Sequence, residues 1–126
     1  MSNFQIGAKV TAIYKTGKYI GEITGIKPEH YLVRVLGVER HPMQGDIHHP
    51  KDANVDFFHQ RRALAYREQT NVPKKMVKAF EGDIPDYTQT LKVAIETIKQ
   101  DLTAQATPWS EKSLQLIEEL ETDYFK

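Results

Sequence analysis

Apolar and polar residues alternate along the first third of the chain, which is the pattern of half-buried β-strands. Between positions 6 and 14 the even-numbered residues are apolar or aromatic, and Lys9 and Thr11 lie between them. A second strand is predicted at 19–26, where Gly21 and Gly25 permit strong bending or close approach of another backbone. Residues 31–38 form a nearly continuous apolar run, which predicts a central strand covered on both faces.

A fourth strand is predicted at 63–66, where the chain reads Ala-Leu-Ala-Tyr after a long connection. Tight turns at 15–18 and 27–29 join the earlier strands into a meander. Short, bent strands in this order favour a small SH3-like antiparallel β-barrel.

The last third of the chain changes to helical periodicity. Asp86 followed by Gln89 predicts a helix start with a capping box, and an apolar stripe from Tyr87 to Leu102 predicts one buried face. Thr107-Pro108 predicts a second helix start, with Leu116, Ile117, Leu120 and Tyr124 as its apolar face and Trp109 and Leu114 near its flanks. The short connection predicts an antiparallel pair that packs on the barrel, because two helices cannot form a core of their own.

The expected fold is therefore α+β, with three parts in one compact unit. Residues 1–70 form the barrel, including a long 39–54 loop, residues 71–85 form a connector with a short turn or strand at 74–80, and residues 86–126 form the helical hairpin. A chain of 126 residues suits a unit of this size.

Composition limits the classes of function. The sequence has no cysteine, so disulfides and thiolate chemistry are excluded, and no segment approaches the roughly 20 apolar residues of a membrane span, so a cytoplasmic protein is expected. The net charge is zero, which argues against strong sequence-independent binding to a polyanion. Residues 86–126 are acidic and the first 85 are basic, which fits either an ordinary soluble surface or a functional basic face.

The 39–75 stretch between the two halves holds four of the five histidines. His41, Asp46, His48, His49 and His59 have residue types that bind divalent metals, but none of the spacings is that of a His-x-x-x-His helix pair. We therefore expect no cofactor and no metal, with the histidines in loop hydrogen bonds or at a partner surface.

Two aromatic rings and two cations follow in the segment Phe57-Phe58-His59-Gln60-Arg61-Arg62. Neighbouring residues on an extended backbone face opposite ways, so one phenylalanine fits the barrel core while the other covers a second layer or anchors a partner. Arg61 and Arg62 suit contacts to a carboxylate or phosphate, and also suit the acidic helices of the same chain.

Several motifs resemble a known family. Pro28-Glu29-His30-Tyr31, His41-Pro42-Met43-Gln44-Gly45-Asp46 and above all the segment 65–73, Ala-Tyr-Arg-Glu-Gln-Thr-Asn-Val-Pro, are similar to the kinase-associated lipoprotein B family of spore-forming bacteria, and the similarity continues to Asp123-Tyr124-Phe125. The resemblance implies an accessory signalling protein that supports a membrane sensor histidine kinase in the phosphorelay that starts sporulation. It implies an SH3-like barrel followed by helices, and it brings no known catalytic residues.

The chain departs from the family's name in one respect. A bacterial lipoprotein needs a lipidated cysteine behind an apolar signal region, and this sequence shows neither. We therefore expect any membrane association to be indirect, through the partner kinase.

A protein-interaction module is the expected function, since the chain lacks the phosphate-binding glycine loop, the nucleophile elbow and the zinc-protease motif of common enzymes. The alternative is a small barrel that binds RNA or another nucleic acid, with Tyr14, Tyr19 and Tyr31 stacking on bases, which the neutral charge disfavours. The sequence leaves the oligomeric state open. The expected partner surface comprises His41, Gln44, Asp46, His48, His49, Phe57, Phe58, His59, Arg61, Arg62, Tyr66 and Arg67.

Overall fold

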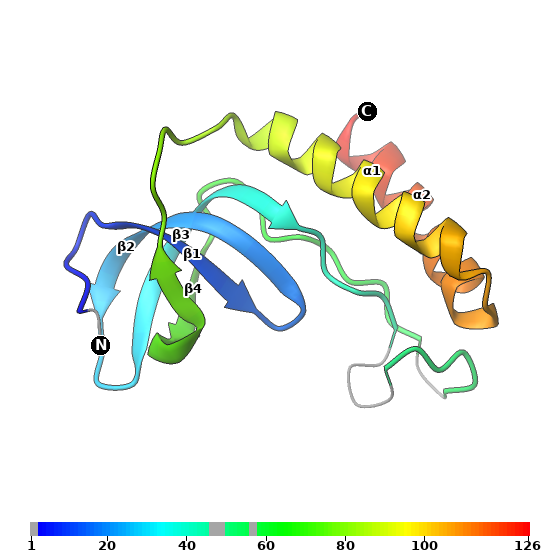
Figure 1. The fold of residues 1–126 in the computed structure, drawn as a ribbon, viewed down its shortest axis with the longest axis horizontal. Coiled ribbons are helices and arrows are strands. Elements are labelled where there is room, and N and C mark those ends of the chain that lie inside the picture. Colours follow the sequence, from blue (N-terminus) through cyan, green and yellow to red (C-terminus); the bar gives the residue numbers. More distant parts are fainter. Residues whose placement is uncertain (1–2, 46–49, 56–57) are drawn as a thin grey trace.

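A computed structural model describes residues 3–45, 50–55 and 58–126 (Figure 1). It shows a five-stranded antiparallel sheet followed by a pair of helices, which confirms the predicted α+β class. The elements are β1 (Lys9–Tyr14), β2 (Gly17–Ile26), β3 (His30–Arg40), β4 (Gln69–Pro73), the short 3-10 helix η1 (Lys74–Met76), β5 (Val77–Ala79), α1 (Tyr87–Gln105) and α2 (Pro108–Tyr124).

The strands follow the order β4-β3-β2-β1-β5, and the curvature of the sheet brings β1 against β4. The register between β2 and β3 shifts before Gly21 and again before Gly25, so both glycines lie at the predicted bends. A Cβ at Gly21 would lie 2.6 Å from the carbonyl oxygen of Arg34, which shows why the backbones can approach here only without a side chain. The inside of the curved sheet is filled by Val10, Ala12, Ile23, Tyr31, Val33, Val72 and Val77.

Two strand predictions require correction. The first strand begins at Lys9 and not at Ile6, which is 66% exposed and precedes Gly7 in a turn with φ +95°. The strand predicted at 31–38 was expected to be covered on both faces, but in β3 fully buried residues alternate with half-buried ones over most of its length. One face of β3 points into the core, and Leu32, Arg34 and Leu36 lie on the other.

The fourth strand was predicted at the wrong place. Residues 63–66 form no strand, and β4 begins at Gln69 after a turn in which Arg67 has φ +70°. β4 pairs with β3 from Gln69 opposite Arg34 to Pro73 opposite His30. The stretch 71–85, expected as a connector, therefore supplies much of β4 and all of β5 to the sheet.

Both helices begin at the predicted caps. The Asp86 side chain accepts a hydrogen bond from the backbone N–H of Gln89, and Thr107 and Ser110 form a reciprocal capping box with Pro108 in the first turn. The helices run antiparallel (Figure 1), and Lys99 on α1 reaches Glu121 on α2 at 2.9 Å. The predicted hairpin is confirmed, although Trp109, expected at the flank, is only 4% exposed.

The helical hairpin packs on the sheet through a second cluster of buried side chains, which joins Tyr19, Val35 and Val38 to both helices. Ile95 and Ile117 are fully buried at its centre. The cluster explains why the helices need the sheet, because each helix has only one apolar face to bury. Within the described part of the chain, neither helix is long and apolar enough to cross a membrane.

Candidate functional site

The segment 60–65 runs between the sheet and the helices and lies at the centre of the candidate site. It belongs to no strand ladder, yet side chains from distant elements satisfy its backbone groups. Tyr124 accepts from the N–H of Ala63 at 2.9 Å, Tyr19 accepts from Leu64, and the Tyr87 hydroxyl donates to the Leu64 carbonyl. These bonds replace the sheet pairing that the sequence predicted here, and they hold the segment in one conformation.

Gln44 fixes the start of the same segment. Its side-chain oxygen accepts from the N–H of Arg61 at 2.8 Å, and its amide nitrogen donates to the Arg61 carbonyl at 2.8 Å. Gln44 is only 4% exposed. The structure therefore removes Gln44 from the predicted partner surface and assigns it to the support beneath that surface.

His41 is likewise internal, with 1% of its surface exposed. Its Nδ1 lies 2.9 Å from the Pro42 carbonyl and its Nε2 lies 3.0 Å from the Tyr124 hydroxyl. Burial away from water lowers the pKa of His41 to about 4, so the ring is neutral at physiological pH. With 1% of its surface exposed, His41 offers a partner little to contact in this conformation, unlike the surface position that the sequence predicted.

Arg62 remains an accessible part of the predicted surface. Its side chain is 55% exposed, forms an ion pair with Asp123, and lies 4.9 Å from the centre of the Tyr124 ring. The hydrogen bond from Lys126 is the leading reason that the pKa of Asp123 is lowered, and the hydrogen bond from Arg62 is the next. The sequence had left open whether the arginines serve a partner or the acidic helices, and in the structure Arg62 pairs with α2.

Arg61 is half-buried and is held by its Nε, which donates to the Gly45 carbonyl at 2.9 Å. Beside the two arginines lies a concave region of about 340 Å³, here called the basic groove, whose lining includes Tyr14, Lys15, Thr16, Arg61, Arg62 and Glu68. Thr16 accepts from the N–H of Met43 at 2.9 Å, so the β1–β2 turn is tied to the segment that carries Gln44. The groove thus lies between three parts of the chain that hydrogen bonds fix relative to one another.

The remaining predicted surface residues are dispersed. Phe58 is half-buried against the helix–sheet core with Lys112 over its ring, while His59 and Arg67 are exposed. Tyr66 is 55% exposed and lies beside Tyr87, in a separate hollow at the start of α1. Asp46, His48, His49 and Phe57 fall outside the described residues.

Metal ligation and base stacking were the two other uses weighed for these side chains. Within residues 3–45, 50–55 and 58–126, no three histidine, aspartate or glutamate side chains lie together as a metal site requires. Tyr19 and Tyr31 are 2% and 3% exposed, so two of the three rings proposed to stack on bases are inside the protein. Burial raises the pKa of Tyr19 to about 12.

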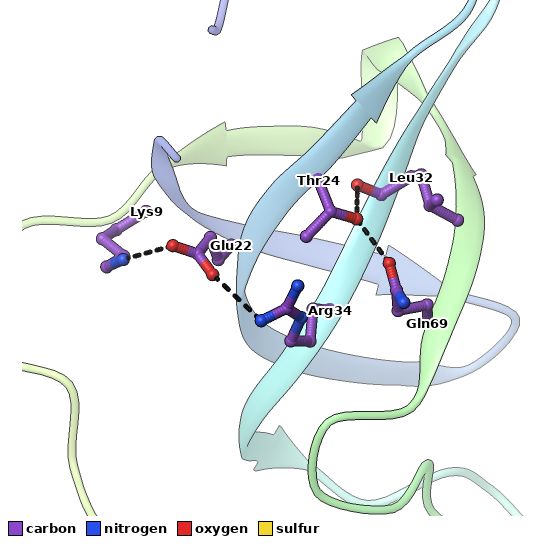
Figure 2. Close-up of polar contacts among 6 residues, drawn as sticks. All are labelled: Lys9, Glu22, Thr24, Leu32, Arg34 and Gln69. Atoms are coloured by element: carbon purple, nitrogen blue, oxygen red, sulfur yellow. Dashed lines mark hydrogen bonds and ion pairs between the residues drawn. The ribbon is translucent and has the colours of Figure 1, made fainter. Parts of the chain in front are cut away.

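Sequence reasoning missed a polar network across the sheet (Figure 2). Glu22 on β2 lies 2.9 Å from Lys9 on β1 and 3.8 Å from Arg34 on β3, and the hydrogen bond from Lys9 is the leading reason that its pKa is lowered. The Thr24 hydroxyl donates to the side chain of Gln69 on β4. The sequence showed these residues only as the polar positions that alternate with apolar ones along each strand. Which of them become neighbours depends on how the strands are aligned with one another.

Lys15 was also missed, because the sequence identified it only as part of a turn. In the structure it has φ 54° and its ammonium lies 5.5 Å from the centre of the Tyr14 ring. A second hollow of about 260 Å³, with an apolar floor of Ala94, Ile98, Leu102 and Trp109, opens between α1 and the chain after β3.

Comparison with known proteins gives three agreeing results. The sequence model of the family described as Kinase associated protein B matches residues 14–125. Kinase-associated lipoprotein B of Bacillus subtilis (strain 168) is 51% identical over 125 residues, which span 99% of this chain and 98% of the relative. The crystal structure of kinase-associated protein B from Bacillus cereus is similar with a TM-score of 0.82 and 47% identity, covering 97% of this chain and 98% of that one.

Proposed function

The chain belongs to the kinase-associated protein B family, and from this membership we propose that it is a non-catalytic accessory protein that supports a sensor histidine kinase by direct contact. The kinase feeds the phosphorelay that starts sporulation. The observation that carries the proposal is similarity over nearly the whole chain to two proteins whose names describe them as kinase-associated.

The geometry around segment 60–65 supports a contact role. Side-chain hydrogen bonds fix the segment beneath an accessible arginine, so little conformational entropy is lost when a partner binds. A rigid surface on a small scaffold is the usual arrangement of a recognition module. The protein acts on the cytoplasmic side of the membrane, and its membrane association depends on the kinase.

Binding to a purified kinase tests the proposal. The cytoplasmic region of the sensor kinase, immobilised and exposed to the full chain, should retain it, and autophosphorylation of the kinase with labelled ATP should change when the chain is added. A chain that neither binds nor alters the kinase contradicts the proposal. The same chain incubated with ATP alone should release no phosphate, and hydrolysis would refute the non-catalytic role.

A genetic test addresses the pathway. In Bacillus subtilis lacking its 51% identical relative, expression of this chain should restore the sporulation frequency. Fractionation of cells with and without the kinase should show the chain leaving the membrane fraction when the kinase is absent. Persistence on the membrane without the kinase would contradict an indirect attachment.

A further inference from the structure

The basic groove concentrates positive charge in a concave region of a chain whose net charge is zero. Its lining carries Lys15, Arg61 and Arg62 against one carboxylate, that of Glu68. Glu68 Oε1 accepts from the backbone N–H of Ala65 at 2.9 Å, so this carboxylate is already used by its own turn. The groove therefore presents a surplus of cations to whatever enters it.

The Arg62 side chain is positioned by its contacts with Tyr124 and Asp123 and remains accessible to a ligand. The Tyr124 ring lies 4.9 Å from its guanidinium carbon, and that ring is fixed because its hydroxyl contacts both His41 and Ala63. The ion pair with Asp123 joins side chains that are 55% and 41% exposed, and exposed pairs of this kind contribute little stability. A partner carboxylate can therefore share or replace Asp123 at small cost, since Lys126 also contacts Asp123 at 3.0 Å.

Lys15 and Arg61 complete the set of cations. The Lys15 ammonium rests over Tyr14, and the Arg61 guanidinium is anchored at Nε by the Gly45 carbonyl, which leaves its terminal nitrogens as donors. Among the described residues, no carboxylate forms an ion pair with Lys15 or Arg61. Two of the three cations thus have no acidic partner within that part of the chain.

From this arrangement we propose that the basic groove docks an acidic, carboxylate-bearing segment of the partner protein. Guanidinium groups pair with carboxylates through two parallel hydrogen bonds, and Lys15 adds a third positive contact. The partner's identity as a kinase rests on the proposed function, whereas the chemistry of the segment rests on the groove. A nucleic acid fits less well, because Tyr19 in the wall is buried and offers no ring face for a base.

A synthetic octaglutamate peptide with a fluorescent label tests the groove without the kinase. Fluorescence anisotropy should show that the full chain binds it and that binding weakens as salt rises. The variant Lys15→Gln/Arg62→Gln should bind at least about fivefold more weakly than the unaltered chain. No binding by the unaltered chain overturns the proposal.

The matched control is Lys75→Gln/Lys78→Gln, which removes the same charge from exposed positions on η1 and β5. It should bind the peptide within about twofold of the unaltered chain. Equally weakened peptide binding in both double variants would show a general effect of charge and would overturn the proposal that the groove is the binding site. Lys15→Gln alone disturbs no ion pair with a described residue. Weaker peptide binding by this single variant therefore still tests the groove if the double variant folds poorly.

Purified kinase separates this inference from the proposed function. If the unaltered chain binds the kinase and Lys15→Gln/Arg62→Gln binds it equally well, the groove is not the docking site, although the accessory role stands. If the unaltered chain binds octaglutamate but not the kinase, the accessory role fails while the groove's preference stands. Inorganic phosphate that displaces the peptide more effectively than free glutamate at equal concentration would overturn the choice of a carboxylate ligand.

Discussion

The Tyr124 hydroxyl, at the end of α2, lies 3.0 Å from Nε2 of His41, just after β3. The Pro42 carbonyl can only accept, so Nδ1 of His41 carries the proton and Nε2 accepts from Tyr124. The Tyr124 oxygen in turn accepts from the N–H of Ala63. One hydroxyl thus joins the end of the sheet, segment 60–65 and the C-terminal helix.

Removing that hydroxyl should destabilise the fold. Tyr124→Phe leaves a buried His41 nitrogen and the Ala63 N–H without their partner, at a cost of roughly 2 to 4 kcal/mol in the free energy of unfolding. Urea denaturation followed by circular dichroism measures the loss. Tyr66→Phe is the matched control, because Tyr66 is 55% exposed, and it should cost less than about 0.5 kcal/mol. Similar losses in both variants would refute the linking role of Tyr124.

Stability should fall as the pH drops from 7 to 5, because the folded chain holds His41 neutral. His41 has a pKa of about 4 in the folded chain and 6.5 as the ordinary value, so below pH 6.5 the unfolded chain binds a proton that the folded chain refuses. Its contribution is fully present above pH 6.5 and is lost as pH falls toward 4, with about 2 kcal/mol gone by pH 5. Urea denaturation at pH 7 and pH 5 measures this loss.

His41→Gln provides the comparison for that pH dependence. Glutamine can still hydrogen-bond at this position but does not titrate, so the variant should be less stable at pH 7 and should lose less stability between pH 7 and pH 5. A variant with the same pH dependence as the unaltered chain would show that His41 is not the responsible group.

Gly21 should not tolerate a side chain. In Gly21→Ala the new Cβ would lie 2.6 Å from both the Arg34 carbonyl oxygen and Val33 Cγ1, so the β2–β3 pairing must shift, at a cost of about 1 to 3 kcal/mol. Gly37→Ala is the control on the neighbouring strand, where the added Cβ meets Thr90 at an ordinary 3.4 Å. Thermal unfolding should show a lower midpoint for Gly21→Ala than for Gly37→Ala, and equal midpoints would contradict the close approach.

The helix–sheet core should depend on Ile95. Ile95→Asp places a charge at a position with no exposed surface, and we expect the variant to be unfolded. Val93→Asp, on the same helix with 64% of Val93 exposed, should remain folded with a change below about 1 kcal/mol. Circular dichroism and the thermal midpoint measure both, and a folded Ile95→Asp variant would refute the packing of α1.

The structure changes how the partner surface should be tested. Joint replacement of Phe58, Arg61 and Arg62, all members of the predicted surface, would remove the packing of Phe58 against the core and the hydrogen bond from Arg61 Nε to the Gly45 carbonyl. Such a variant risks loss of folding. Lys15 and Arg62 are the better targets, because no hydrogen bond between described residues that supports segment 60–65 runs through either side chain.

Local sequence was sufficient for the elements whose signals lie within a few residues. The capping residues Asp86 and Thr107, the stripe that buries Leu91 and Ile95, and the bends at Gly21 and Gly25 were all readable, because capping, helical periodicity and the absence of Cβ act over short distances. Short motifs, above all the segment 65–73, likewise carried the family resemblance that the comparisons confirm.

Tertiary structure alone determined the conformation of segment 60–65 and the burial of His41 and Gln44 in the stretch before it. Apolar letters at 63–66 predict a strand, but hydroxyls of Tyr19, Tyr87 and Tyr124, each distant in sequence, satisfy the backbone there, and the strand forms later at Gln69. His41 and Gln44 look like surface residues in the sequence, yet long-range hydrogen bonds make them internal supports. Sequence specifies local geometry directly, whereas burial and the partners of buried polar groups depend on which distant elements meet.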